Sequence, residues 1–287
     1  STGTIHPGPS RTFEEPKQPE GLSAGQLQGL VSLNSIRAAV GVPPATQLAS
    51  IAQAAQAHAD FYVAHATQYS AAGLSPHAED ASFGDGFTGA NFGQRMAAAG
   101  FGGAPGAEVM AFTGSAQGAM QGWLETVYHR LPLVDPRTEF VGVGLAKAGG
   151  TSAEVMNTSA GGEDGTAIVV YPVPGQEGVA RRWLGNEGPQ PPAPPAGYPS
   201  GPVISARMPG AFEVLAHRLI DEDTGTDVAH VWLDKANDPT LAAFDTRTVV
   251  LYANSPLAAA RTYRVRLELK LPGAQEVLQW RFTTAAQ

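Results

Sequence analysis

Apolar residues recur every three or four positions along the first half of the chain, a periodicity typical of helices that pack one face against a core. In the first such stretch Leu27, Leu30 and Val31 share a face, and Ser23 is placed to cap the helix start. The second stretch is rich in Ala, and its small side chains permit close packing against another layer. The pattern predicts helices at about residues 23–41, 46–66, 91–100 and 116–131.

The periodicity changes after residue 139. Short β-rich runs at residues 140–147, 153–157 and 167–172 are separated by Gly-rich turns, so they predict a small antiparallel sheet. Helices followed by such a sheet favour an α+β domain built in layers.

The end of the chain alternates between apolar and charged residues. Between Thr262 and Leu271 every second residue is apolar, as in a strand with one buried face. Pro272 and Gly273 then turn the chain into a second alternating run around Trp280. With four earlier apolar runs this makes about six strands, which predicts a small all-β sandwich of immunoglobulin-like type.

Prolines concentrate between Gly185 and Pro202, where they favour a stiff polyproline II spacer. The first residues of the chain are polar and rich in Pro, without apolar periodicity, and are expected to be extended. We therefore divide the chain into an extended arm (1–22), an α+β domain (23–175), a Pro-rich linker (176–202) and an all-β domain (203–287).

Composition narrows the function. The net charge of −8 disfavours nucleic acid as a partner, because a phosphate backbone would be repelled. The chain has no Cys, which excludes disulfides, thiolate nucleophiles and Cys-ligated metals. There is no apolar run of membrane-spanning length and no leader at Ser1. We expect a mature exported protein whose signal peptide has been removed.

The chain lacks the Walker A, HExxH, GxSxG and Rossmann motifs, so any site must use its His and Glu residues. Glu125 and His129 are four apart in a predicted helix, so their side chains should share a face. His77 and Glu79 are two apart and would point to one side of an extended segment. Glu108 precedes an apolar run, where a carboxylate needs a partner. Such groups could bind a divalent cation such as zinc, or act as an acid and base.

Spacing alone is weak support for these roles, because a helical Glu/His pair is usually a solvated surface contact. We interpret the remaining histidines of the predicted helices and strands as structural: His58, His65, His217 and His230.

Several strings resemble the CAP superfamily of cysteine-rich secretory, antigen 5 and pathogenesis-related 1 proteins. LNSIRAAVG is similar to the first-helix signature of that superfamily. GWLETVYHRLPLVDPRTEFVGVGLA is similar to its Trp-containing helix, its His-Arg pair and the Gly-Val-Gly strand that follows. HAED, FTGANFGQRMAAAGF and GAEVMAF fall between them in the expected order.

The resemblance implies an α-β-α sandwich with a cleft lined by two His and two Glu. His77 and His129 would be the imidazoles and the ligands of any metal, and Glu108 the first acid. The second acid is Glu125 or its rival Glu79. The absence of disulfides points to the bacterial branch.

By this resemblance we expect an exported bacterial binding protein of the extracellular space or cell envelope, and we favour a non-enzymatic role over an enzymatic one. Its cleft would hold a divalent cation (zinc or calcium), a small polar ligand, a lipid or an envelope component. One alternative is a metal-assisted hydrolase of peptides or cell wall, with His129 as base and Glu108 or Glu125 as its partner. Another is a structural surface component that self-associates through the β domain.

Overall fold

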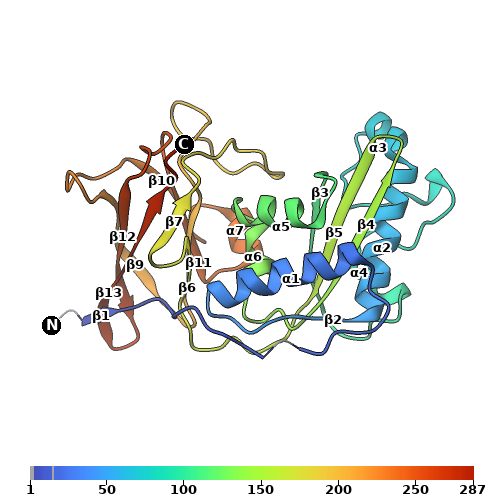
Figure 1. The fold of residues 1–287 in the computed structure, drawn as a ribbon, viewed down its shortest axis with the longest axis horizontal. Helices are drawn as coiled ribbons and strands as arrows, with labels where there is room; N and C mark the ends of the chain where they lie inside the picture. The colour runs from blue at the N-terminus through green and yellow to red at the C-terminus, as the bar shows by residue number, and fades with distance from the viewer. Residues whose placement is uncertain (1–2, 15) are drawn as a thin grey trace.

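The computed structural model describes residues 3–14 and 16–287 and consists of a helix-rich half and a β-rich half that lie side by side (Figure 1). The helix-rich half contains α1 (Ala24–Ala39), β2 (Thr46–Gln47), α2 (Ala49–Ala64), α3 (Ala66–Ala72), a 3₁₀ turn (Ala81–Phe83), α4 (Phe92–Ala98), β3 (Pro105–Ala111), α5 (Ala116–Leu124), α6 (Arg130–Val134), β4 (Phe140–Ala148) and β5 (Thr151–Ser159). The β-rich half contains β1 (Gly3–Ile5), β6 (Val169–Tyr171), β7 (Gln176–Val179), β8 (Ile204–Arg207), β9 (Glu213–Asp221), β10 (His230–Leu233), α7 (Pro239–Phe244), β11 (Thr248–Ala253), β12 (Thr262–Leu271) and β13 (Ala274–Thr284).

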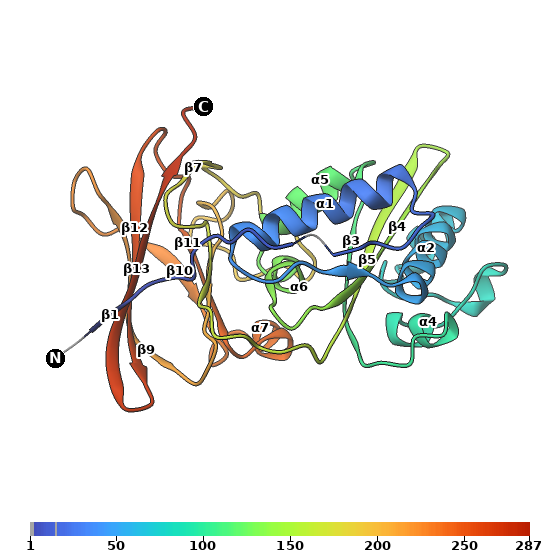
Figure 2. The same cartoon turned by 60° about the horizontal axis from the view of Figure 1, so that its bottom comes forward.

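The helix-rich half is an α-β-α sandwich, as predicted. Its sheet has the strand order β2-β4-β5-β3. Figure 2 shows α1 and α5 on one face of this sheet and α2 and α4 on the other. None of the helices in the described part of the chain is long and apolar enough to cross a membrane.

Strand β4 explains how the layers fit together. Val141 and Val143 point into the core beneath α1 and α5, whereas Gly142 and Gly144 face α2. A Cβ atom at either glycine would lie 2.2 Å from the backbone of α2. The Ala-rich helix and the Gly-Val-Gly strand therefore match, since each lacks the bulk that would separate their backbones.

The first predicted helix begins where expected, since Ser23 and Gln26 form a capping box at the start of α1. The helix predicted over 116–131 is instead broken: α5 ends at Leu124 and α6 begins at Arg130. In the turn between them, the backbone N–H groups of Val127 and Tyr128 donate to a carboxylate from elsewhere in the chain, Glu187. The prediction that Glu125 and His129 lie one turn apart on a single helix is therefore wrong.

The β-rich half consists of two sheets around one core. One has the order β1-β13-β12-β9, with β7 also pairing with β13, and the other has the order β10-β11-β8-β6. Their facing residues, such as Leu219, Val265 and Phe282 from one sheet and Ile204 and Leu251 from the other, pack together. This agrees with the predicted all-β module; its immunoglobulin-like type stays a prediction.

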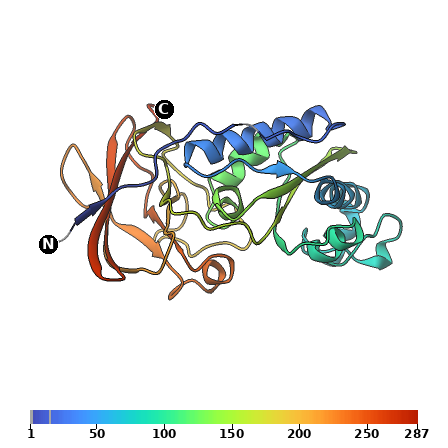
Figure 3. The same cartoon turned by 90° about the horizontal axis from the view of Figure 1, so that it is seen from below.

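Three segments differ from the predicted boundaries. The run at 167–172 pairs through β6 with β8, in the β-rich half and not in the first sheet. The predicted linker begins with β7, which pairs with β13. The expected N-terminal arm forms β1 on β13 and then follows α1 (Figure 3), with backbone hydrogen bonds from Gly8 to Ile168 and from Arg11 to Ala38. Each of these segments is held by backbone hydrogen bonds. Such bonds leave no pattern of side chains in the sequence from which the pairing could be predicted.

The two halves share a core, so the Pro-rich segment is not a free spacer. Tyr128 and Leu131 of the helix-rich half pack with Trp183 of the Pro-rich segment and with Leu241 and Tyr252 of the β-rich half. The Tyr128 hydroxyl donates to Asp238 over 2.8 Å. Burial and the Asp238 carboxylate raise the pKa of Tyr128, so this hydroxyl stays a donor.

A buried ion cluster joins the halves a second time. The Arg207 guanidinium lies 2.9 Å from Asp245, 2.7 Å from Asp164 and 3.7 Å from Asp135. Asp135 follows α6, whereas Arg207 and Asp245 belong to the β-rich half. The buried Arg207 guanidinium therefore has a carboxylate partner from each half of the molecule.

We therefore expect the chain to unfold in one cooperative transition, because the halves share the core around Tyr128 and Tyr252, which is lost when either half unfolds. Differential scanning calorimetry tests this, with a ratio of van't Hoff to calorimetric enthalpy near one as the expected result. Two resolved transitions would contradict the shared core.

A second prediction concerns His217 on β9 and His230 on β10, the end strands of the two sheets. Their rings are joined by a 2.8 Å hydrogen bond, and Trp232 stacks on His217 with ring centroids 4.1 Å apart. Burial, and then the nearby His230, lower the pKa of His217 below its usual 6.5. His217 thus binds a proton more readily in the unfolded chain than in the folded one. The contribution of the neutral His217 ring to the free energy of unfolding is therefore complete above pH 6.5 and is lost as the pH falls.

Urea titrations at a series of pH values check this. The free energy of unfolding should fall more steeply below pH 6.5 in the wild type than in His217→Gln. Identical pH profiles for the two proteins would refute it.

Candidate functional site

His77 and His129 line the same cleft, which has two adjoining parts. The larger part, about 560 Å³, is also walled by Met110, Phe112 and Trp123. The smaller part, about 240 Å³, has largely apolar walls that include Phe92, Tyr128 and Phe244. Phe244 belongs to α7, so the β-rich half contributes to the cleft.

One wall is built on Glu108 of β3. Its carboxylate is almost fully buried and lies 3.1 Å from Nδ1 of His77. Nη2 of Arg95, from α4, donates to both Glu108 oxygens over 2.8 Å. Burial alone would raise the pKa of Glu108, but the His77 hydrogen bond and the nearby cations hold this pKa below its usual value. The carboxylate stays ionised and orients the His77 ring.

A second buried pair supports the loop that carries His77. Nδ1 of His58 lies 2.9 Å from Oε1 of Glu79, and Nε2 of His58 lies 2.9 Å from the Pro76 carbonyl oxygen. The other oxygen of Glu79 accepts a hydrogen bond from the Thr88 backbone. Glu79, one of the two candidates for the second acid, is therefore turned into the protein interior. His58 supports the loop from behind, a role the sequence did not reveal because its partner is 21 residues away.

The opposite wall holds His129 through a residue that the sequence did not single out. Nδ1 of His129 lies 2.8 Å from Oε1 of Glu187, whose side chain is fully buried. The backbone N–H groups of Val127, Tyr128 and His129 donate to the same carboxylate over 2.8, 2.7 and 2.8 Å. Glu187 comes from the Pro-rich segment, where nothing in the local sequence indicates a buried charge.

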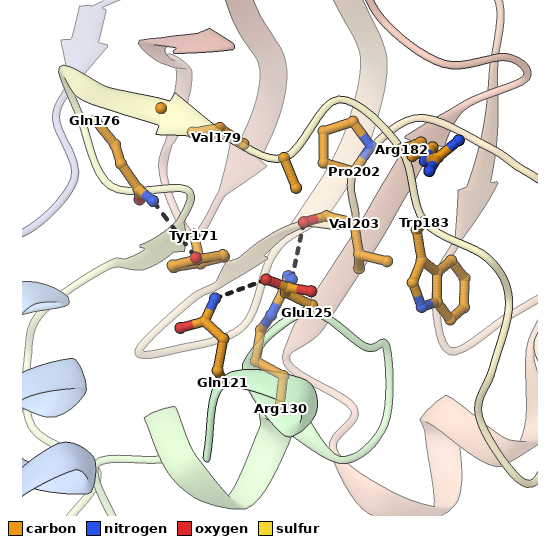
Figure 4. Close-up of a pocket in the computed structure, with 12 residues that line it drawn as sticks. Gln121, Glu125, Arg130, Tyr171, Gln176, Val179, Arg182, Trp183, Pro202 and Val203 are labelled. Atoms are coloured by element: carbon orange, nitrogen blue, oxygen red, sulfur yellow. Dashed lines mark hydrogen bonds between the residues drawn. The ribbon is translucent and has the colours of Figure 1, made fainter. Parts of the chain in front are cut away.

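Glu125, the other candidate for the second acid, lies outside the cleft. It accepts a hydrogen bond from Gln121 and lines a separate pocket of about 140 Å³ with Arg130 and Tyr171 (Figure 4). Its position follows from the end of α5, which turns Glu125 away from His129. The second carboxylate beside the imidazoles is therefore Glu187.

Arg130, the residue after His129, joins the halves. Its buried guanidinium donates to the carbonyl oxygens of Leu124 and Val203 and lies over the Tyr171 ring, 4.6 Å from the centroid. Burial lowers the pKa of Arg130 to about 10, while Tyr171 and nearby carboxylates oppose the shift. Arg130 thus remains charged at neutral pH and helps to fix the position of His129.

The donor set fits a metal ion only in part. Each imidazole uses Nδ1 for a carboxylate, and no protein group in the described part of the chain is hydrogen-bonded to Nε2 of either ring. A carboxylate behind Nδ1 is the usual arrangement for a metal-ligating imidazole. Within residues 3–14 and 16–287, however, no three His, Asp or Glu side chains are grouped to hold a metal. A cation held by both imidazoles would complete its coordination with water or a ligand.

Comparison with known proteins identifies the helix-rich half. Residues 30–160 match the model of the cysteine-rich secretory protein (CAP) family. This range includes His77, Glu108 and His129 but not Glu187.

The solved structures that are similar to the chain include one from a bacterium and one from an animal parasite. One is an extracellular protein containing an SCP domain from Bacillus anthracis, with 21% identity over 48% of this chain and a TM-score of 0.35. The chain covers only 40% of that protein. The other is venom allergen-like protein 4 of Schistosoma mansoni, with 22% identity over 49% of this chain and 90% of that one, and a TM-score of 0.32. No curated protein matches the chain.

Replacing Arg95 tests the wall built on Glu108. Arg95→Met leaves the buried Glu108 carboxylate without its guanidinium partner, which should cost about 3–5 kcal/mol in the free energy of unfolding at neutral pH. Glu108 stabilises the fold above its unfolded-state pKa, and this stabilisation is lost as the pH falls. The difference in free energy of unfolding between the wild type and Arg95→Met should therefore become smaller at acidic pH. Denaturant unfolding measures both effects, with Arg182→Met, an exposed site, as the control. Equal stability of the two variants would contradict the role of Arg95.

Proposed function

We propose that this chain, in which residues 30–160 form a CAP domain, is an exported bacterial binding protein. Its ligand would occupy the cleft between His77 and His129. The observation that carries this proposal is that two imidazoles, 52 positions apart in the sequence, line one cavity, each held by a buried carboxylate. Buried charges are costly, and a pair that fixes polar side chains at a cavity wall is more typical of a binding site than of a packing core.

Export is supported by the family and by the chemistry of the chain. The Bacillus anthracis protein to which it is similar is described as extracellular. The buried ion pairs and the backbone pairing of the terminal arm stabilise the chain without Cys, which suits a bacterial exported protein. Attachment to the cell envelope is a further part of the proposal.

Two classes of ligand suit the cleft. A divalent cation such as zinc or calcium would bind the free Nε2 atoms, with water or a bound molecule as its remaining ligands. A small polar ligand would instead accept or donate hydrogen bonds at the same atoms. Two imidazoles are fewer than the three protein ligands of a typical catalytic zinc site, which favours weak, exchangeable metal binding.

Hydrolysis is the alternative, and the His129–Glu187 contact favours it. A carboxylate on Nδ1 orients an imidazole as a general base, which leaves Nε2 to take a proton from water. In the described chain no side-chain hydroxyl is hydrogen-bonded to His129, so water would have to be the nucleophile. Digestion of peptides and peptidoglycan by the wild type, but not by His129→Ala, would support this activity.

Isothermal titration with zinc and with calcium tests the binding proposal. The wild type should bind at least one of the two, and the variant carrying His77→Ala and His129→Ala should bind it at least about tenfold more weakly. His6→Ala, an exposed site outside the cleft, serves as the control and should match the wild type. Equal affinity of the wild type and the double variant would remove the metal claim.

A further inference from the structure

We propose that the groups around Glu187 form a carboxylate-binding subsite, which the segment Asn186–Pro189 fills as an internal competitor of the ligand. This rests on the proposed function of the cleft as a ligand site, and it names the chemical class of the ligand. We call Asn186–Pro189 the cleft strap.

The first observation is the match between donors and carboxylate. Oε2 of Glu187 accepts from the Val127 backbone N–H, and Oε1 accepts from the N–H groups of Tyr128 and His129 and from Nδ1 of His129. All four donors belong to the helix-rich half, and all lie within 2.8 Å of a carboxylate oxygen. Four convergent donors on two oxygens satisfy a carboxylate group, and removing the acceptor would leave backbone N–H groups facing a cavity.

The second observation is independent of these hydrogen bonds. The two parts of the cleft share His77, His129, Gly188 and Pro189 as lining residues. The cleft strap therefore lies between a space of about 560 Å³ and one of about 240 Å³. If the strap moved away, both spaces would open onto the donors that now hold Glu187. A ligand carboxylate placed there would sit in the middle of the cleft with room on either side.

The third observation concerns how the strap is attached. Asn186, Gly188 and Pro189 are exposed, and Glu187 is the only buried residue of the four. Beyond the strap, the chain is fixed by the buried Trp183 on one side and the buried Pro191 on the other. The strap is thus tethered at both ends and held in the cleft by a single side chain.

Exchange with an external carboxylate is therefore a competition between like groups. Opening the strap breaks the hydrogen bonds of one carboxylate, and a ligand carboxylate makes the same bonds. The tether gives Glu187 an effective concentration in the millimolar range or above, so the intact strap weakens the apparent affinity of a free carboxylate. A ligand with further contacts in the two adjoining spaces would overcome this competition.

The experiment uses the full chain with Glu187→Ala and sodium acetate as the probe. Backbone amide resonances of Val127, Tyr128 and His129 are followed by ¹H–¹⁵N NMR. In Glu187→Ala, millimolar acetate should move these three resonances toward their wild-type positions, and acetate should bind at least about tenfold more tightly than to the wild type. Acetamide, which has the same shape but no charge, should have little effect. Glu177→Ala, which removes an exposed carboxylate of β7, should behave as the wild type.

The proposal is overturned if folded Glu187→Ala shows no response of these amides to acetate, or if acetate and acetamide act equally. If Glu187→Ala does not fold, Glu187→Gln carries the same comparison, because acetate should displace an amide more readily than a carboxylate. Failure of both variants to fold would also overturn the proposal, since the strap would then be an indispensable part of the fold. The NMR readout needs no metal, so a negative result with acetate does not affect the outcome of the metal titration of His77 and His129. A negative metal titration likewise does not affect the outcome with acetate.

Discussion

A carboxylate buried away from water must be paired, and the cleft depends on two of them. Glu108 is held by Arg95 and His77, and Glu187 by three backbone N–H groups and His129. In each case the cost of burying the charge is offset only if the partners keep their positions. The two imidazoles are among those partners, so pairing the charges also fixes the geometry of the cleft.

The two carboxylates differ in origin, and this difference connects the halves of the molecule. Glu108 lies on β3, an end strand of the sheet in the helix-rich half, whereas Glu187 belongs to the Pro-rich segment that leads into the β-rich half. The shared core around Tyr128 includes Trp183 of that segment and so holds it in place. The Pro-rich segment and the β-rich half therefore complete the cleft, through Glu187 and Phe244 respectively, and the β-rich half is more than an appended spacer.

Local sequence predicted the elements whose signals are local. The capped first helix, the Ala-rich second helix and the alternating strands near Trp280 are present because periodicity and capping residues act over a few positions. The resemblance to CAP proteins placed His77, Glu108 and His129 in order, and the fold brings these three residues to one cleft. Long-range pairing escaped prediction: β6, β7 and β1 joined strands far away in the sequence. The role of Glu187 was not predicted for the same reason, since its hydrogen-bond donors lie about 60 positions upstream. A Glu among prolines is also expected to be solvated. The Glu187 carboxylate accepts hydrogen bonds from backbone N–H groups in the turn where the predicted helix over 116–131 is broken.

A crystal structure of the full chain, from protein purified without chelator, tests the central claim most directly. The account predicts His77 and His129 in one cleft, with Nδ1 of each imidazole within hydrogen-bonding distance of Glu108 and of Glu187, respectively. A Pro-rich segment that projects into solvent, with Glu187 away from His129, would contradict it.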